Sequence, residues 1–303
     1  IDMYEKENIA SYVELIWGLP EETVDSFIDG VTYIMEEGYH TYLDIHLMML
    51  LPNAPINEPG YKDQFGIKSV NAQPRFSHRS NPENLVDDLV SFVTATRKCS
   101  HEDWIKGHQF RWLVIFGHYL GPLQFISRAM KKIYDINYKD FYTDILSYCE
   151  KYPNTYLGKE YLTIKNNLTK ILKNERHWGD VIPGCGNINW EVDEATCIRL
   201  VNGKDIFYKE MSEYLETKYD MDKNVLSNII KYQKFRLHDP NIQYPLTESF
   251  DYNIHDVIEN NKKFTDKKNT QTCNGKNYKD IYEWAKFTLW FGRRIARYKT
   301  RVK

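Results

Sequence analysis

The chain has 303 residues, with 40 Lys and Arg against 42 Asp and Glu, so its formal net charge is −2. This near-balance argues against a nucleic acid or a membrane surface as a partner, because such partners are held by an excess of positive charge. No apolar run approaches the roughly eighteen residues that span a bilayer. At about 150 residues per domain the length predicts about two domains, and 42% hydrophobic with 27% charged residues is a globular composition.

The first residues and the cysteines indicate where such a chain works. The opening IDMYEKEN is charged, unlike a signal peptide, and the chain begins with Ile rather than Met, so we expect a fragment of a longer protein. Five scattered cysteines form no CxxC or CxxxCxxC pattern. They predict free thiols in a reducing cytoplasm, with neither a disulfide framework nor a metal site in this chain.

The clearest local pattern is a strand, a helix and a second strand. Residues 12–17 form an apolar strand that Gly18 ends, and residues 21–37 place apolar side chains at helical spacing. Residues 42–48 form the second strand. A βαβ unit of this kind predicts two adjacent parallel strands, and parallel strands usually have both faces covered.

Polar side chains interrupt both strands. Side chains alternate along a strand, so Glu14 shares a face with Ile16, and Asp44 shares a face with His46. In a covered parallel sheet the two carboxylates and the imidazole would line a polar, functional interior. At an exposed edge they would simply face solvent, and alternation alone does not decide between the two.

Several motifs, in their order along the chain, resemble radical S-adenosylmethionine (SAM) enzymes of the branch that also binds cobalamin. Together they extend over most of the chain. The motifs are ELIWGLPEET at 14–23, LPNAPI at 51–56, YKDQFGI at 61–67, EDW at 102–104, QFISR at 124–128 and WFGRR at 290–294.

The resemblance implies a fold. In that family a partial (β/α)6 barrel binds a [4Fe-4S] cluster through CxxxCxxC after its first strand. Residues 1–75 would be the end of this barrel, with 12–17 and 42–48 as its fifth and sixth strands, and 76–303 a mainly helical C-terminal extension. The expected class is therefore α/β followed by mostly α. The cluster, and cobalamin where it is used, would be bound by the missing N-terminal part of the same protein.

The resemblance also implies contacts with SAM. The family's fifth strand carries G-x-I-x-G-x-x-E, which supports the adenine side of SAM, and Ile16, Gly18 and Glu21 match this pattern. At the end of the sixth strand, Leu51 and Pro52 would approach the adenine.

The chemistry implied for the family is hydrogen abstraction from a small-molecule substrate by a 5′-deoxyadenosyl radical, inside an interior that excludes water. Glu14 replaces the first glycine of the fifth-strand pattern and is left free to face the substrate. With Asp44 and His46 it forms the candidate catalytic set, which would orient the substrate or accept a proton. Two alternatives stay open: a helical interaction module without catalysis, and a transferase with an α/β half.

The remainder of the chain reads as mostly helical. Ser100 and Asp103 resemble a capping box that opens a long helix. Residues 260–276 are rich in Lys and Asn and predict a solvated loop or hairpin. The spacing predicts helices over 81–98, 100–119, 123–134, 138–150, 156–175, 193–218 with a possible break at Gly203, 223–233 and 278–297.

Two single residues invite a functional interpretation. Cys185 lies between glycines, where a nucleophile would be accessible, but no nearby His–Asp arrangement supports that role and we predict a tight turn. His108 lies on an aromatic helical stripe, which is typical of a hydrogen-bonded core histidine.

Overall fold

The computed structural model describes residues 12–72, 77–80, 89–175 and 179–302. The predicted βαβ unit is present in it as β1 (Val13–Trp17), α2 (Val24–Glu36) and β2 (Leu43–Leu47). β1 and β2 are parallel and adjacent, in one two-stranded sheet. The prediction of neighbouring parallel strands is therefore confirmed. A capping box between Thr23 and Ser26 begins the helix between them.

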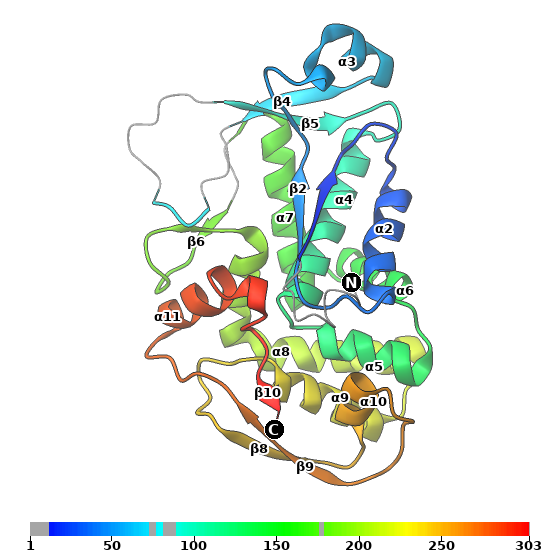
Figure 1. Ribbon diagram of the computed structural model, residues 1–303, viewed down its shortest axis with the longest axis vertical. Helices are drawn as coiled ribbons and strands as arrows, with labels where there is room; N and C mark the ends of the chain where they lie inside the picture. The colour runs from blue at the N-terminus through cyan, green and yellow to red at the C-terminus, as the bar shows by residue number, and fades with distance from the viewer. Residues whose placement is uncertain (1–11, 73–76, 81–88, 176–178, 303) are drawn as a thin grey trace.

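One face of this strand pair packs against helices. Figure 1 shows β1 and β2 side by side in front of α4 (His101–Val114), with α2 beside them. Trp17 is fully buried here, and its Nε1 donates to the carbonyl of Trp104 at 3.3 Å. Gly107 of α4 allows the close approach, because a Cβ at this position would lie 2.2 Å from the Trp17 ring.

A second small sheet follows, in the order β3-β5-β4, formed by β3 (Met49–Leu50), β4 (Lys68–Ala72) and β5 (Val90–Ala95). The prediction of a helix over 81–98 is wrong for residues 90–95. Their sequence, VSFVTA, is rich in β-branched and aromatic residues, which favour a strand. Residues 81–88 lie outside the described residues. Between β3 and β4 lie a 3-10 turn, Pro55–Asn57, and α3, Pro59–Phe65.

Helices make up most of the chain beyond this sheet. The capping box predicted at Ser100 and Asp103 is present, and α4 continues into a π-helical turn at Ile115–Tyr119. Gly203 does not interrupt α8; its missing Cβ instead makes room for the Tyr156 ring, which would lie 2.3 Å away. The other helices are α5 (Gln124–Tyr134), α6 (Tyr138–Lys151), α7 (Tyr156–Leu172), α8 (Val192–Tyr219), α9 (Lys223–Arg236) and α10 (Ile254–Asn260).

The C-terminal part is less helical than predicted. A three-stranded antiparallel sheet contains β8 (Leu246–Phe250), β9 (Asn269–Asn274) and β10 (Arg301–Val302). In the tract 260–276, predicted as a solvated loop or hairpin, residues 261–268 form a loop and 269–274 form β9, which pairs antiparallel with β8. The helix predicted over 278–297 is instead three short pieces. They are α11 (Ile281–Ala285), a π-turn (Lys286–Trp290) and a 3-10 turn (Arg293–Ile295).

The short hairpin β6 (Asp180–Val181) and β7 (Asn189–Trp190) carries Cys185 in its connection. The Cys185 N–H donates to the carbonyl of Ile182, which confirms the tight turn. Its thiol is buried, and burial raises the pKa of Cys185 to about 11. A thiol with that pKa is a poor nucleophile at neutral pH.

One hydrophobic core extends from Trp17 to Leu289 and joins the strand pair to the helices. The division of the chain at residue 75 stays a prediction. None of the helices in the described ranges combines the length and apolar character needed to cross a lipid bilayer.

A buried polar network lies before β2, at the amino ends of the strand pair. His40 Nδ1 lies 2.9 Å from His118 Nε2, and His118 Nδ1 lies 2.8 Å from the Tyr142 hydroxyl. Burial lowers the pKa of both histidines well below the usual value. The folded protein therefore holds both imidazoles neutral near neutral pH.

This network predicts that the chain is sensitive to mild acid. Below about pH 6.5 His40 and His118 become protonated in the unfolded chain but stay neutral in the folded chain. The free energy of unfolding therefore falls by up to about 1.4 kcal/mol per histidine per pH unit. Urea unfolding at pH 7.5 and 5.5 measures this loss. Equal stability of the wild-type chain at the two pH values would refute the assignment.

Candidate functional site

The predicted polar residues lie on the face of β1 and β2 that the helices leave open. In the register, Glu14 is opposite Asp44 and Ile16 is opposite His46. Ile16 is 44% exposed, and the side chains of Glu14 and His46 are 41% and 49% exposed. The structure thus brings Glu14, Asp44 and His46 to one face, as alternation along the strands predicts.

Glu14 lies between two basic groups on this face. One of its carboxylate oxygens is 3.7 Å from His46 Nε2, and the other is 3.9 Å from Arg294 Nη2. Both separations exceed hydrogen-bond length. These loosely paired groups therefore leave donor and acceptor capacity for a ligand.

Asp44 is more enclosed than its two companions. The Tyr42 hydroxyl donates to one carboxylate oxygen at 3.1 Å, and the Ile45 N–H donates to the other at 2.9 Å. Burial alone would raise the pKa of Asp44, but the guanidinium groups of Arg293 and Arg111 outweigh burial and lower it. Asp44 is therefore an ionised, fixed acceptor rather than a proton donor at neutral pH.

The two edges of the strand pair differ. At the outer edge of β2, Arg111 Nε donates to the Ile45 carbonyl at 2.6 Å, so a side chain occupies the place of a further strand. Among the described residues no strand pairs with the outer edge of β1. The pair is closed on one side and can accept another strand on the other.

The last turn of the chain contributes two arginines to this region. Arg293 is buried, and its guanidinium carbon lies 5.5 Å from the centre of the Tyr42 ring. Arg294 is exposed and lies 4.9 Å from the Tyr12 ring. Sequence reasoning did not name either arginine as a site residue, although both belong to the WFGRR motif at 290–294.

The residues matched to the SAM pattern lie at or just beyond the carboxyl ends of the strands, where ligands of parallel sheets bind. Gly18 has φ +97°, and its N–H donates to a Glu22 carboxylate oxygen at 3.1 Å. Ile16 and Leu51 are 44% and 56% exposed, and such uncovered apolar side chains fit a flat apolar group such as adenine. The full set is Ile16, Gly18, Glu21, Leu51 and Pro52.

The cysteines are not arranged as cluster ligands in the parts of the chain that the structure describes. All five are buried, and burial raises the pKa of Cys99 to about 12. Within the described ranges no group of three or more His, Cys, Asp or Glu side chains is placed to hold a metal ion.

We expect no stoichiometric iron–sulfur cluster when the purified chain is incubated anaerobically with iron and sulfide. A cluster of this kind is held by several closely placed thiolates. Iron and acid-labile sulfide analysis with visible absorbance measures the outcome. One stable cluster per chain would show that the cysteines have been misjudged.

Comparison with known proteins adds an independent observation. No family model matches the chain. The cobalamin-dependent radical SAM methyltransferase TokK of Streptomyces tokunonensis is 29% identical over 228 residues, which cover 71% of this chain and 33% of TokK. The 2-(S-pantetheinyl)-carbapenam-3-carboxylate methyltransferase of Streptantibioticus cattleyicolor is 27% identical over 224 residues, 70% of this chain and 33% of that enzyme.

The chain thus spans about a third of the length of the curated relatives it matches. The name of TokK contains both terms of the resemblance that the motifs predicted, radical SAM and cobalamin. This chain is related in sequence to the cobalamin-dependent branch of the radical SAM enzymes.

Proposed function

We propose that this chain is the C-terminal part of a cobalamin-dependent radical SAM methyltransferase, and that the open face of β1 and β2 lines its substrate cavity. The observation that carries the proposal is the parallel strand pair itself. Helices cover one of its faces, while the other exposes Glu14, Ile16 and His46. Because parallel sheets are normally covered on both faces, an open face with polar side chains favours a cavity wall in a larger assembly.

The unequal edges support the place of these strands in a barrel. Arg111 closes the edge of β2, as expected of a terminal strand. The outer edge of β1 can pair with a preceding strand, which the N-terminal part of the same protein would supply. β1 and β2 would then be the fifth and sixth strands of a partial barrel.

In this family the bound cofactors supply the radical chemistry and the methyl group, so the residues of this chain bind, orient and exclude water. Ile16 and Leu51 would cover the adenine of SAM with apolar surface. Asp44, held ionised, would accept hydrogen bonds from the substrate. Glu14 and His46 would fix a second polar group of the substrate.

The substrate that this face favours is a small polar molecule. One relative is named for a carbapenam-3-carboxylate substrate. By analogy we propose that the substrate here also carries an anionic group, for which Arg294 offers an exposed guanidinium. The proposed setting is the cytoplasm, where buried thiols stay reduced.

The test is an anaerobic assay of the polypeptide in its complete reading frame, after reconstitution with iron, sulfide and cobalamin. Methyl-labelled SAM should transfer its label to a small molecule in a cell extract. Ile16→Asp, which places a carboxylate against the proposed adenine contact, should abolish SAM binding, while Ile206→Asp at an exposed position on α8 should not. A complete polypeptide that neither binds nor cleaves SAM would refute the proposal.

A further inference from the structure

We infer that Arg293 is a positioning residue of the proposed substrate face: it fastens residues 290–294 to the acidic start of α8, holds Arg294 at that face and contributes positive charge near Asp44. The role of that face as the wall of a substrate cavity rests on the proposed function. The contacts of Arg293 stand on the structure alone.

The guanidinium of Arg293 pairs with carboxylates of the protein itself, so its role is to position neighbouring residues and not to bind a ligand. Its Nη1 lies 3.5 Å from Glu194 and 3.7 Å from Glu191, and its Nη2 lies 3.6 Å from Asp193. The side chains of Asp193 and Glu194 have no exposed surface. Since buried carboxylates are costly without a cation, these contacts tie the last turn of the chain to the start of α8.

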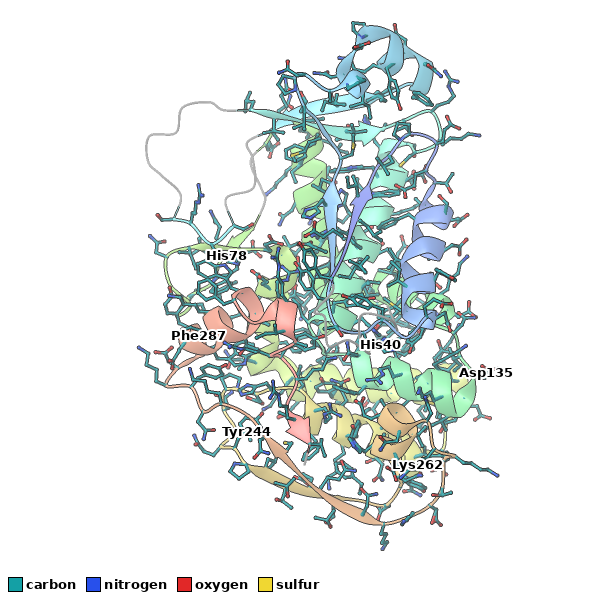
Figure 2. All side chains as sticks on the ribbon, viewed as in Figure 1. His40, His78, Asp135, Tyr244, Lys262 and Phe287 are labelled. Carbon is teal, nitrogen blue, oxygen red and sulfur yellow. The ribbon has the colours of Figure 1, made fainter. Side chains whose placement is uncertain are left out.

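A second contact holds the same segment. The Trp290 ring stacks on His78 with centroids 4.2 Å apart, and His78 Nε2 lies 2.7 Å from a Glu194 carboxylate oxygen. Figure 2 shows His78 beside the C-terminal segment. Residues 290 and 293 are therefore held by the same carboxylate, one directly and one through His78.

This anchoring determines where the next residue lies. Arg294 has 62% of its side chain exposed, and its guanidinium lies 4.9 Å from the Tyr12 ring and 5.8 Å from the Tyr42 ring. Its five N–H donors lie in one plane, and the nearest carboxylate, that of Glu14, is 3.9 Å away, beyond hydrogen-bond length. Arg293 thus holds Arg294 at the open face, where N–H donors of the Arg294 guanidinium are available to a ligand.

Arg293 also reaches Asp44 electrostatically. The charged or titratable groups around Asp44 are Arg293 and Arg111, which lower its pKa together with His46, and Glu191, which raises it; the Tyr42 hydroxyl donates to its carboxylate. The Arg293 guanidinium lies 5.5 Å from the centre of the Tyr42 ring, whose hydroxyl donates to Asp44, so this positive charge is close to the carboxylate. Removing Arg293 should therefore raise the Asp44 pKa, and removing Glu191 should move it back.

The opposite effects of Arg293 and Glu191 on the Asp44 pKa provide a test, because general disruption of the structure would not produce shifts of opposite sign. The purified chain is labelled with ¹³C at aspartate carboxyls, Asp44 is assigned with Asp44→Asn, and the resonance is titrated by NMR. In the wild-type chain the pKa of Asp44 should lie below the usual value for an aspartate. Arg293→Gln should raise its pKa by about one unit or more, and Arg293→Lys by less. Adding Glu191→Gln to Arg293→Gln should return part of the shift.

The matched control is Arg297→Gln, an exposed arginine four residues after Arg293, which should leave the Asp44 titration unchanged. If Arg293→Gln fails to fold, two other variants provide the test. One is the double variant Arg293→Gln with Glu191→Gln, which removes one cation and one anion together, and the other is Arg293→Lys. An unchanged Asp44 titration in the folded variants would overturn the inference.

The two proposals fail separately. Absence of SAM cleavage by the complete polypeptide would remove the proposed function and leave the NMR result standing. An unchanged Asp44 titration would remove the role of Arg293 and leave the methyltransferase proposal standing. In an active complete polypeptide, Arg293→Lys should shift the acid limb of the pH–rate profile upward, and Arg297→Lys should not.

Discussion

Replacing Trp17 with alanine is expected to lower the free energy of unfolding of the chain by about 4 kcal/mol, in the range measured for large aromatic truncations in cores. Trp17 is fully buried between the strand pair and the helices, and the centroid of its ring lies 4.5 Å from that of the Phe27 ring. Alanine would leave a cavity and also remove the hydrogen bond to the Trp104 carbonyl.

Urea unfolding of the purified chain measures this loss, with Ile16→Ala as the matched control. Ile16 is the adjacent residue on the open face, so its truncation should cost well under 1 kcal/mol in the isolated chain. A loss below about 1 kcal/mol for Trp17→Ala would contradict the packing described here.

Gly107 allows a second check of the same contact. Gly107→Ala alone should destabilise the chain by about 1–3 kcal/mol, because the new methyl group would overlap the Trp17 ring. The double variant Trp17→Ala with Gly107→Ala should lose less stability than the sum of the two single variants, because the ring that the new methyl group would overlap is absent. Strict additivity would show that α4 and β1 are not in contact.

In the complete polypeptide, Asp44→Asn is expected to lower the turnover number about 100-fold, the loss that slight misplacement of a bound substrate can cause. Asparagine keeps the shape of the side chain but removes the charge that faces Arg111 and Arg293. The positive charge of those two guanidinium groups would then no longer be offset by Asp44 at the substrate face. His46→Gln should lower turnover less, because His46 is paired only loosely.

The control for this prediction is Asp29→Asn, an exposed aspartate on α2 that pairs with Lys139 away from the open face. Single-turnover rates at saturating substrate, with circular dichroism to verify folding, make the comparison. Turnover within about twofold of wild type for both Asp44→Asn and His46→Gln would remove these residues from the site.

The strand–helix–strand unit could be predicted because its signals are local. Apolar runs, helical spacing and stops such as Gly18 lie within a few residues of the elements that they define. The shared face of Glu14, Asp44 and His46 followed from alternation once the two strands were parallel neighbours. β5 was missed because the helix-start pattern at residues 81–82 outweighed the strand preference of 90–95.

The remaining site residues could not be predicted, because distant parts of the fold bring them together. Arg111 and Arg293 reach Asp44 from positions 67 and 249 residues further along the chain, and no local pattern marks these contacts. β8 was missed, and β9 was predicted only as part of a solvated loop or hairpin, for a related reason. Their Thr and Ser side chains pair only across strands separated by α10.

The measurement that tests the central claim most directly is chemical modification of His46 by diethyl pyrocarbonate, followed by peptide mass spectrometry. In this chain His46 is half-exposed on the open face and should react readily, whereas the buried His118 should not. In the complete polypeptide, which would cover this face as a cavity wall, His46 should be protected, and SAM together with substrate should protect it further. A His46 that reacts as fast in the complete polypeptide as in this chain would contradict the claim that the open face lines the substrate cavity.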